Sequence, residues 1–284
     1  MTTTTTAPTG PATAERSGLS FGGVLRSEAI KLTTLRSTVW CFAIIVLVTV
    51  GLAFLLAATF FTPAPLPDDG VQAVWVQVGT LGITFSQLVV AVLGALVITG
   101  EYSTGMIRST LTAVPRRIPA LAAKAIVIGV ATFVVGLVSV LAAAFLPAGI
   151  LAGNGAEPDF ADPAAYAAFA GGALYLALIA VLSLSIGTIV RNSAGGIAAS
   201  LGLLLVVPGV LSLIAAITST EWLQNLSQFL PSALGNVLYA YPQDTGPVPD
   251  GIVALEPWQA ALWLFAWVAV AFATAAVLIK RRDA

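Results

Sequence analysis

The sequence has 284 residues, of which 58% are hydrophobic and only 9% are charged, and its mean hydropathy is +0.98. This composition excludes an ordinary soluble domain and is typical of a polytopic membrane protein. The absence of histidine and the presence of one cysteine exclude an internal disulfide, a His/Cys metal site and a histidine-activated nucleophile. A Gly-x4-Gly-Lys-Ser/Thr phosphate loop is also absent, so we expect no catalytic residue, metal ligand or bound cofactor in this chain.

The N-terminal region is predicted to contain a tail and an amphipathic helix. Residues 1–17 are rich in Thr, Ala and Pro, lack the basic start of a signal peptide, and are predicted to be disordered. Phe21–Val39 is predicted to be a helix whose apolar stripe consists of Phe21, Val24, Leu25, Leu32, Leu35 and Val39. Three basic residues flank or oppose that stripe, where their charges can reach lipid headgroups: Arg26, Lys31 and Arg36. A positively charged flank of the first span is an equally good interpretation, and both interpretations place this end in the cytoplasm.

Six long apolar runs without charge predict six membrane spans. The runs cover approximately residues 39–61, 78–99, 118–146, 164–190, 194–217 and 258–279. Each is long enough to cross, because about 20 helical residues span the hydrocarbon core. The predicted fold class is therefore an all-α polytopic membrane protein, with one transmembrane domain over residues 18–284. The basic beginning of the third span is expected to protrude into the cytoplasm.

The charged residues outside the spans separate by sign. With both termini in the cytoplasm, all 12 basic residues fall on the cytoplasmic side. The outer connectors then contain only acidic residues: Asp68, Asp69, Glu157, Asp159, Asp162, Glu221, Asp244, Asp250 and Glu256. This distribution follows the positive-inside rule and predicts cytoplasmic termini.

The connector Gly100–Lys124 concentrates charge in a chain that has little. It contains Glu101, Arg108, Arg116, Arg117 and Lys124. Within the segment Ser103–Val114, one helical face carries Met106, Ile107, Thr110, Leu111 and Val114, and Pro115 should end the helix. A passive surface helix is the simpler interpretation, whereas the arrangement of the whole chain favours a docking element for a cytoplasmic partner. We also expect Glu101 to pair with Arg26, Lys31 or Arg36.

The last outer connector, residues 218–257, is predicted to contain two short helices separated by Pro231. An interfacial aromatic belt of Trp222, Tyr239 and Tyr241 is the overlapping alternative.

The spans themselves contain few polar groups. No Asp, Glu, Lys or Arg lies clearly within a span, which argues against an ion-coupled carrier. Gln87 is expected to make a hydrogen bond between helices, and the alternative is that Thr84 and Gln87 line a substrate path. Pro208 should kink the fifth span, because it cannot donate a hydrogen bond to the carbonyl of Leu204.

Several segments resemble the permease subunit of ABC transporters of the type-2 exporter family. The resemblance covers nearly the whole chain after Ser17. It rests on residues 27–32 (SEAIKL), residues 35–38 (LRST), and the connector pattern Glu101, Gly105, Ile107-Arg108, Leu111, Pro115-Arg116-Arg117 and Lys124. The six spans and the long outer segment before the last span fit the same family.

The resemblance implies a division of labour between several chains. The connector would be the coupling helix that contacts a nucleotide-binding ATPase subunit, through Glu101, Met106, Ile107, Arg108, Leu111, Arg116 and Arg117. Phe21–Ser37 would be the connecting helix. ATP and magnesium would bind to the separate ATPase subunit, and a second permease chain, identical or different, would complete the substrate path.

The resemblance also implies a bacterial plasma-membrane exporter that works by alternating access. Its substrate would be amphipathic or hydrophobic, such as a lipid, a peptide antibiotic or a drug. Membrane lipids are the other expected partners, and nucleic acid is not expected. Two alternatives stay open: a secondary carrier or facilitator that works alone, and a membrane scaffold that recruits a cytoplasmic partner without transport.

Overall fold

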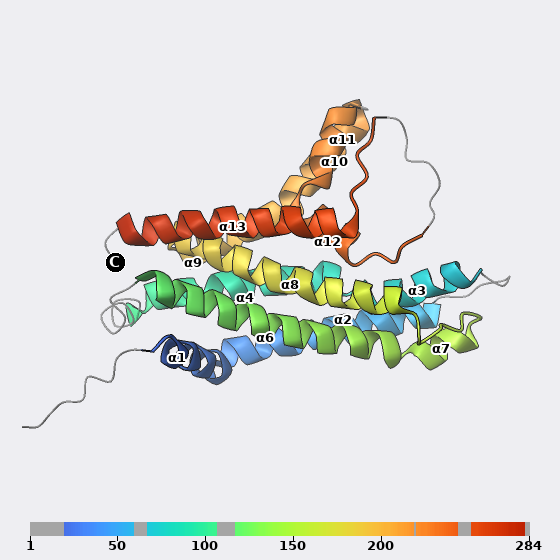
Figure 1. Ribbon diagram of the computed structural model, residues 1–284, viewed down its shortest axis with the longest axis horizontal. Helices are drawn as coiled ribbons and strands as arrows, with labels where there is room; N and C mark the ends of the chain where they lie inside the picture. The colour runs from blue at the N-terminus through green and yellow to red at the C-terminus, as the bar shows by residue number, and fades with distance from the viewer. Residues whose placement is uncertain (1–19, 60–66, 107–116, 219, 244–250, 282–284) are drawn as a thin grey trace, which may run out of the picture.

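The computed structural model describes residues 20–59, 67–106, 117–218, 220–243 and 251–281. This part of the chain is helical and contains no strand. Its long helices run side by side in alternating directions (Figure 1). The predicted disordered tail, residues 1–17, lies outside the described residues. The helices are α1 (Phe21–Thr34), α2 (Arg36–Thr59), α3 (Asp68–Thr80), α4 (Ile83–Ser103), α6 (Arg117–Phe145), α7 (Ala148–Gly153), α8 (Pro163–Val190), α9 (Ser193–Leu201), the π-helix η1 (Gly202–Val206), α10 (Val207–Thr218), α11 (Glu221–Gln228), α12 (Pro231–Leu238) and α13 (Pro257–Arg281).

Six helical stretches of the described residues are long and apolar enough to cross a membrane. They are Arg36–Thr59, Asp68–Ser103, Arg117–Gly153, Pro163–Val190, Ser193–Thr218 and Pro257–Arg281. The predicted all-α polytopic fold is thereby confirmed. The second stretch begins at Asp68, earlier than predicted. Hydropathy did not indicate this first part, because Asp68, Asp69 and the glutamines of α3 are polar although the segment is helical.

Helix α8 forms the centre of the bundle. It packs against α4, α6 and α13, and it has the largest buried share of the six candidate spans. Two glycines of the second stretch allow close helix approach. A Cβ atom on Gly94 would lie 2.3 Å from the carbonyl oxygen of Ala180, and one on Gly82 would lie 2.3 Å from Cα of Thr49. Small residues at these crossings let the backbones of α4 and α8, and of α2 and the α3–α4 turn, come into contact.

The fifth span is irregular, as predicted from Pro208. Between α9 and α10 the chain forms the π-helix η1, and the backbone N–H of Val207 donates to the carbonyl of Gly202, five residues earlier. Pro208 follows directly and has no N–H for the carbonyl of Leu204. Helix α10 then leaves the bundle at a steep angle (Figure 1), and Ala215 is its one buried residue.

The predicted helix Phe21–Val39 is wrong in its extent. Helix α1 ends at Thr34, Leu35 is extended, and α2 begins at Arg36. The hydroxyl of Thr34 donates to the carbonyl of Ile30 at 2.9 Å, and Thr33 makes similar bonds one position earlier. Such bonds from β-branched residues compete with regular helix geometry and favour an end here.

The buried face of α1 also differs from the predicted stripe. Its buried residues are Val24, Glu28 and Leu32, whereas Phe21 and Leu35 are exposed. A hydrophobic stripe counts only apolar side chains, so it could not include a buried glutamate.

The two short helices expected in the last connector are present. Helices α11 and α12 are separated by Phe229 and Leu230, and Pro231 is the first residue of α12. Proline suits this position because its missing N–H has no partner in the first helical turn.

Candidate functional site

Charge on the described helices is separated along the bundle. We call the end where α1 begins, α4 ends and α6 begins the basic end, because Lys31, Arg117, Lys124 and Lys280 lie on these and neighbouring helix ends. We call the opposite end the acidic end. It carries the acidic residues of α3 and of the α7–α8 turn: Asp68, Asp69, Glu157, Asp159 and Asp162.

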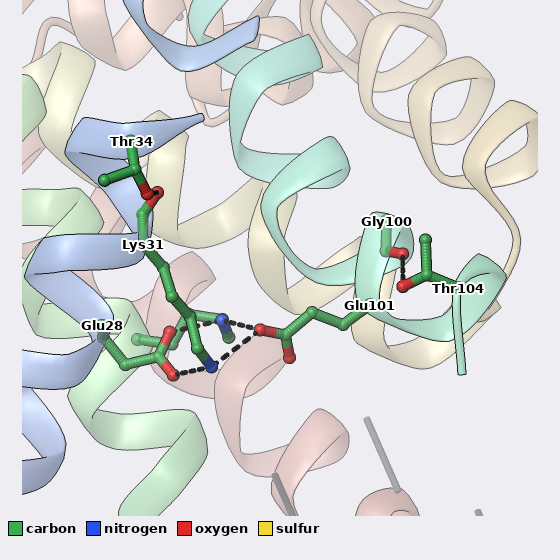
Figure 2. Close-up of polar contacts among 7 residues, drawn as sticks. Glu28, Lys31, Thr34, Gly100, Glu101 and Thr104 are labelled. Carbon is green, nitrogen blue, oxygen red and sulfur yellow. Dashed lines mark hydrogen bonds and ion pairs between the residues drawn. The ribbon is translucent and has the colours of Figure 1, made fainter. Parts of the chain in front are cut away.

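Four side chains at the basic end form an ion cluster, which consists of Glu28, Lys31, Glu101 and Lys124 (Figure 2). The ammonium of Lys124 lies 2.5 Å from Oε2 of Glu28 and 2.8 Å from Oε1 of Glu101. The ammonium of Lys31 lies 2.7 Å from Oε1 of Glu28 and 3.2 Å from the same Oε1 of Glu101. Two carboxylates and two ammonium groups therefore balance each other.

The ion cluster joins three helices that are distant in sequence. Glu28 and Lys31 lie one turn apart on α1, Glu101 lies in the last turn of α4, and Lys124 lies in the first part of α6. The connector between α4 and α6 therefore starts and ends beside the same charged cluster. Helix α1 is tied to both ends of that connector.

Burial makes the balance of charge important. The exposed fractions are 4% for Glu28, 7% for Glu101 and 5% for Lys124, while the Lys31 side chain is 30% exposed. An isolated charge at such a site costs several kcal/mol, on the order of 3–5 if one partner of a buried pair is removed. The cluster is stable because each ion has at least two opposite neighbours.

The two titratable groups on α1 respond to these neighbours. Burial alone would raise the pKa of Glu28, but the charge and hydrogen bond of Lys124, with those of Lys31, lower it below the ordinary value of 4.5. Burial alone would lower the pKa of Lys31, but the hydrogen bond to Glu28 and the charge of Glu101 raise it above 10.5. Both groups are therefore held in their charged forms near neutral pH.

The structure brings some of the predicted site residues together and leaves others apart. The expected pairing of Glu101 with Lys31 is present, whereas Arg26 and Arg36 are exposed. Lys124, in the basic start of the third span, is buried in the bundle, where two carboxylates compensate its charge. The expectation that this start protrudes into the cytoplasm stays a prediction. Sequence reasoning missed Glu28 altogether, although its position midway between Val24 and Leu32 on one helical face was an available signal.

The described part of the connector differs from the predicted segment Ser103–Val114. Ser103 is the last residue of α4, and the chain turns at Thr104 and at Gly105, whose φ is +70°. A glycine suits this left-handed conformation. Met106 is the last described residue before the gap, and its side chain is exposed. The other predicted contact residues Ile107, Arg108, Leu111 and Arg116 lie outside the described residues.

Arg117 links the connector to the far end of the chain. Its guanidinium donates to the carbonyl of Ile279 at 2.9 Å, which joins the first turn of α6 to the end of α13. On the other side of α4, the guanidinium of Arg191 lies 5.5 Å from the centre of the Tyr102 ring, within reach of a cation–π interaction. The helices that end at the basic end are therefore cross-linked by several polar contacts.

Thr84 and Gln87 occupy different environments. Gln87 is buried, its Nε2 donates to the carbonyl of Thr84 at 2.9 Å, and the hydroxyl of Tyr175 on α8 donates to its Oε1. This is the geometry of the expected hydrogen bond between helices. Thr84 is exposed on α4.

A second feature of the bundle, near the acidic end, was not anticipated. The indole of Trp75 is fully buried, its N–H donates to the carbonyl of Ala144 at 2.9 Å, and four aromatic rings surround it edge-on. These rings belong to Phe145, Phe160, Tyr166 and Phe169. They fix α3 against α6 and α8, at a distance from the ion cluster.

These observations define a polytopic helical membrane protein in which a basic connector between two spans is anchored at both ends and to an amphipathic first helix. Over residues 24–284 the chain matches the family described as ABC-2 family transporter protein, and it belongs to that family. It is therefore a membrane permease of an ABC transporter. A search of curated proteins found no match.

Proposed function

We propose that this chain is the membrane-spanning subunit of an ATP-driven exporter in a bacterial plasma membrane, with its basic end and both termini in the cytoplasm. A separate ATPase subunit binds ATP and magnesium and docks on the connector between α4 and α6. The cargo is an amphipathic or hydrophobic molecule, such as a lipid, a peptide antibiotic or a drug.

The observation that carries this proposal is the ion cluster. Glu101 and Lys124 flank the connector and lie 2.8 Å apart, and both contact residues of α1. A docking partner that displaces the connector must therefore move the end of α4, the start of α6 and α1 as one unit. Because buried ion pairs are costly to separate, the cluster favours transmission of the movement over local deformation.

The mechanism that follows is alternating access. Closure of the ATPase subunits on ATP shifts the connector, and the spans attached to it change their packing. The only energetic requirement is that the ATP-bound partner binds one arrangement of the spans better than the other. Residues of the connector that contact the partner include Ile107, Leu111 and Arg116.

Helix α10 supports the presence of a second permease chain, identical or different. It leaves the bundle and buries a single residue of its own, so most of its residues are exposed in this chain. Helices in membranes gain stability by close packing with other helices. A second chain that covers this helix would supply such packing, and the exposed Thr84 on α4 would then border the path between the two chains.

Co-purification tests the proposed function. The tagged chain is extracted from its native membrane in a mild detergent, and associated proteins are identified by mass spectrometry. We expect an ATPase subunit to co-purify and the reconstituted complex to move cargo only when ATP is supplied. Transport by the chain without any ATPase would support a secondary carrier instead. A retained partner without transport of any tested cargo, under conditions where a known exporter is active, would support a scaffold.

A further inference from the structure

A cavity of about 420 Å³ lies next to the ion cluster at the basic end. Its wall is formed mainly by apolar side chains of α1, α4 and α6, and the turn between α1 and α2 contributes polar groups. The apolar part includes Leu32, Leu96, Val97, Val127 and Ile128. The volume is within the range of small-molecule sites, which is roughly 300–1,000 Å³.

One oxygen of the ion cluster lacks a hydrogen-bond partner. Both lysines donate to Oε1 of Glu101, whereas Oε2 of Glu101 is buried and accepts no bond from the described residues. Figure 2 shows Oε2 turned away from both ammonium groups. Glu101 also lines the cavity and is 7% exposed. A buried carboxylate oxygen without a donor is unfavourable, so the site is suited to a ligand that donates an N–H or O–H group.

Lys31 provides the complementary group. An ammonium has three N–H donors, and two of them serve Glu28 and Glu101. The side chain is 30% exposed and lines the same cavity, so its remaining donor can reach an anionic oxygen. An unused acceptor on Glu101 and an unused donor on Lys31 thus belong to two neighbouring residues that line the same cavity.

We propose that this cavity binds a phospholipid whose headgroup carries a primary ammonium. The ammonium donates to Oε2 of Glu101, the phosphate accepts from Lys31, and part of an acyl chain lies against Leu96, Val97 and Val127. The position is appropriate because the cavity lies where α1 meets the ends of two membrane spans. This proposal requires only that the chain spans a membrane and does not depend on the direction or cargo of transport.

The number of N–H donors on the headgroup tests the proposal directly. Ethanolamine phospholipid and its N-methylated and N,N-dimethylated forms all keep at least one N–H, whereas the trimethylated choline form has none. The purified chain is equilibrated in detergent with equal amounts of these lipids with identical acyl chains, and retained lipid is measured by native mass spectrometry. We expect the first three to be retained and the choline lipid to bind roughly tenfold more weakly, the loss of one charge-assisted hydrogen bond. Equal retention of all four lipids would overturn the proposal and indicate that water satisfies Glu101.

A pair of matched substitutions locates the site. Val127→Phe places a ring in the cavity, whereas Val130→Phe makes the same change on the same helix at a position that is 59% exposed and does not line it. We expect Val127→Phe to abolish the preference for the lipids that carry an N–H over the choline lipid, and Val130→Phe to keep it. Thermal unfolding of both variants is measured in parallel. A folded Val127→Phe chain that keeps the preference would place the lipid elsewhere, and if that variant does not fold, the methylation series decides alone.

Discussion

Glu101 and Lys124 are 23 residues apart in the chain, and their side chains meet at 2.8 Å. Between them lies the connector that we propose as the docking site of an ATPase subunit. Because both also bind partners on α1, the start and the end of the connector cannot move independently without breaking a buried ion pair. The balance of buried charge in this permease and its proposed coupling to an ATPase subunit therefore both depend on the four side chains of the ion cluster.

The first prediction concerns Lys124. Both Lys31 and Lys124 contact the two buried carboxylates, and Lys124→Met removes the more deeply buried of these cations and leaves Lys31 alone to compensate them. We expect the free energy of unfolding to fall by about 3–5 kcal/mol, the usual cost of an uncompensated buried charge. Reversible unfolding in detergent micelles measures this loss.

Arg26→Met is the matched control, because Arg26 is an exposed cation on α1. It should change the free energy of unfolding by no more than about 0.5 kcal/mol. If both substitutions had equally small effects, the ion cluster would not stabilise the bundle.

The second prediction concerns pH. Because the pKa of Glu28 is lowered on folding, its stabilising contribution is fully present above the ordinary value of 4.5 and is lost as the pH falls through the lower pKa of the folded state. The pKa of Lys31 is raised, so its contribution is present below 10.5 and is lost as the pH rises through its folded-state pKa.

Glu28→Gln separates this effect from the titration of other carboxylates. The difference in unfolding free energy between the wild type and Glu28→Gln should be constant near neutral pH and should shrink below pH 4.5. Urea titrations at a series of pH values provide the measurement. A difference that grows towards acid pH would mean that the pKa of Glu28 is raised on folding instead.

The sequence predicted the features of this fold that depend on composition along one helix. Spans, the irregularity at Pro208 and the break at Pro231 follow from local hydropathy and from the chemistry of proline, and the described helices agree with them. The end of α1 at Thr34 depends on side-chain bonds to the backbone, which hydropathy does not register.

The candidate site was predictable only in part, for a physical reason. A buried charge is compatible with a membrane bundle when its partners come from other helices, and that information is tertiary. A pairing of Glu101 with a basic residue of the N-terminal helix was predicted, and Lys31 was one of three candidates. The burial of Lys124 and the role of Glu28 were not predicted, since each depends on the crossing of α1 with α6.

The third prediction concerns the hydrogen bond between α4 and α8. Tyr175→Phe removes the hydroxyl that donates to Oε1 of Gln87. We expect a loss of about 0.6–2 kcal/mol in the free energy of unfolding, the range for polar contacts between membrane helices. Tyr166→Phe is the control, because its hydroxyl bonds to the carbonyl of Phe160 at an exposed position where water can replace it. Unchanged stability with altered transport in Tyr175→Phe would favour a role for Gln87 in the substrate path.

The fourth prediction concerns orientation in the membrane. In a Cys41→Ser background, cysteines introduced at Asp69 and Asp159 should react with a membrane-impermeant maleimide in intact cells. A cysteine introduced at Arg26 should react only after the membrane is opened. The expectation rests on the basic residues at one end of the bundle and on the acidic residues of α3 and of the α7–α8 turn at the other. Labelling of Arg26→Cys in intact cells would reverse the proposed orientation.

The last prediction concerns the connector itself. Ile107 and Leu111 share one face of the predicted coupling helix, and both lie outside the described residues. If that face packs on the ATPase subunit, the double substitution Ile107→Ala/Leu111→Ala removes its central anchors. Loss of one such anchor typically costs about 2 kcal/mol, roughly a thirtyfold loss of affinity. The double variant should therefore lose the ATPase in pull-down experiments and lose ATP-driven transport, while its thermal unfolding stays unchanged because the ion cluster is intact. The paired substitution Ile126→Ala/Val130→Ala, at exposed positions on α6, should keep both partner and transport. A double connector variant that retains both would show that the segment is a passive surface helix and that the ATPase docks elsewhere.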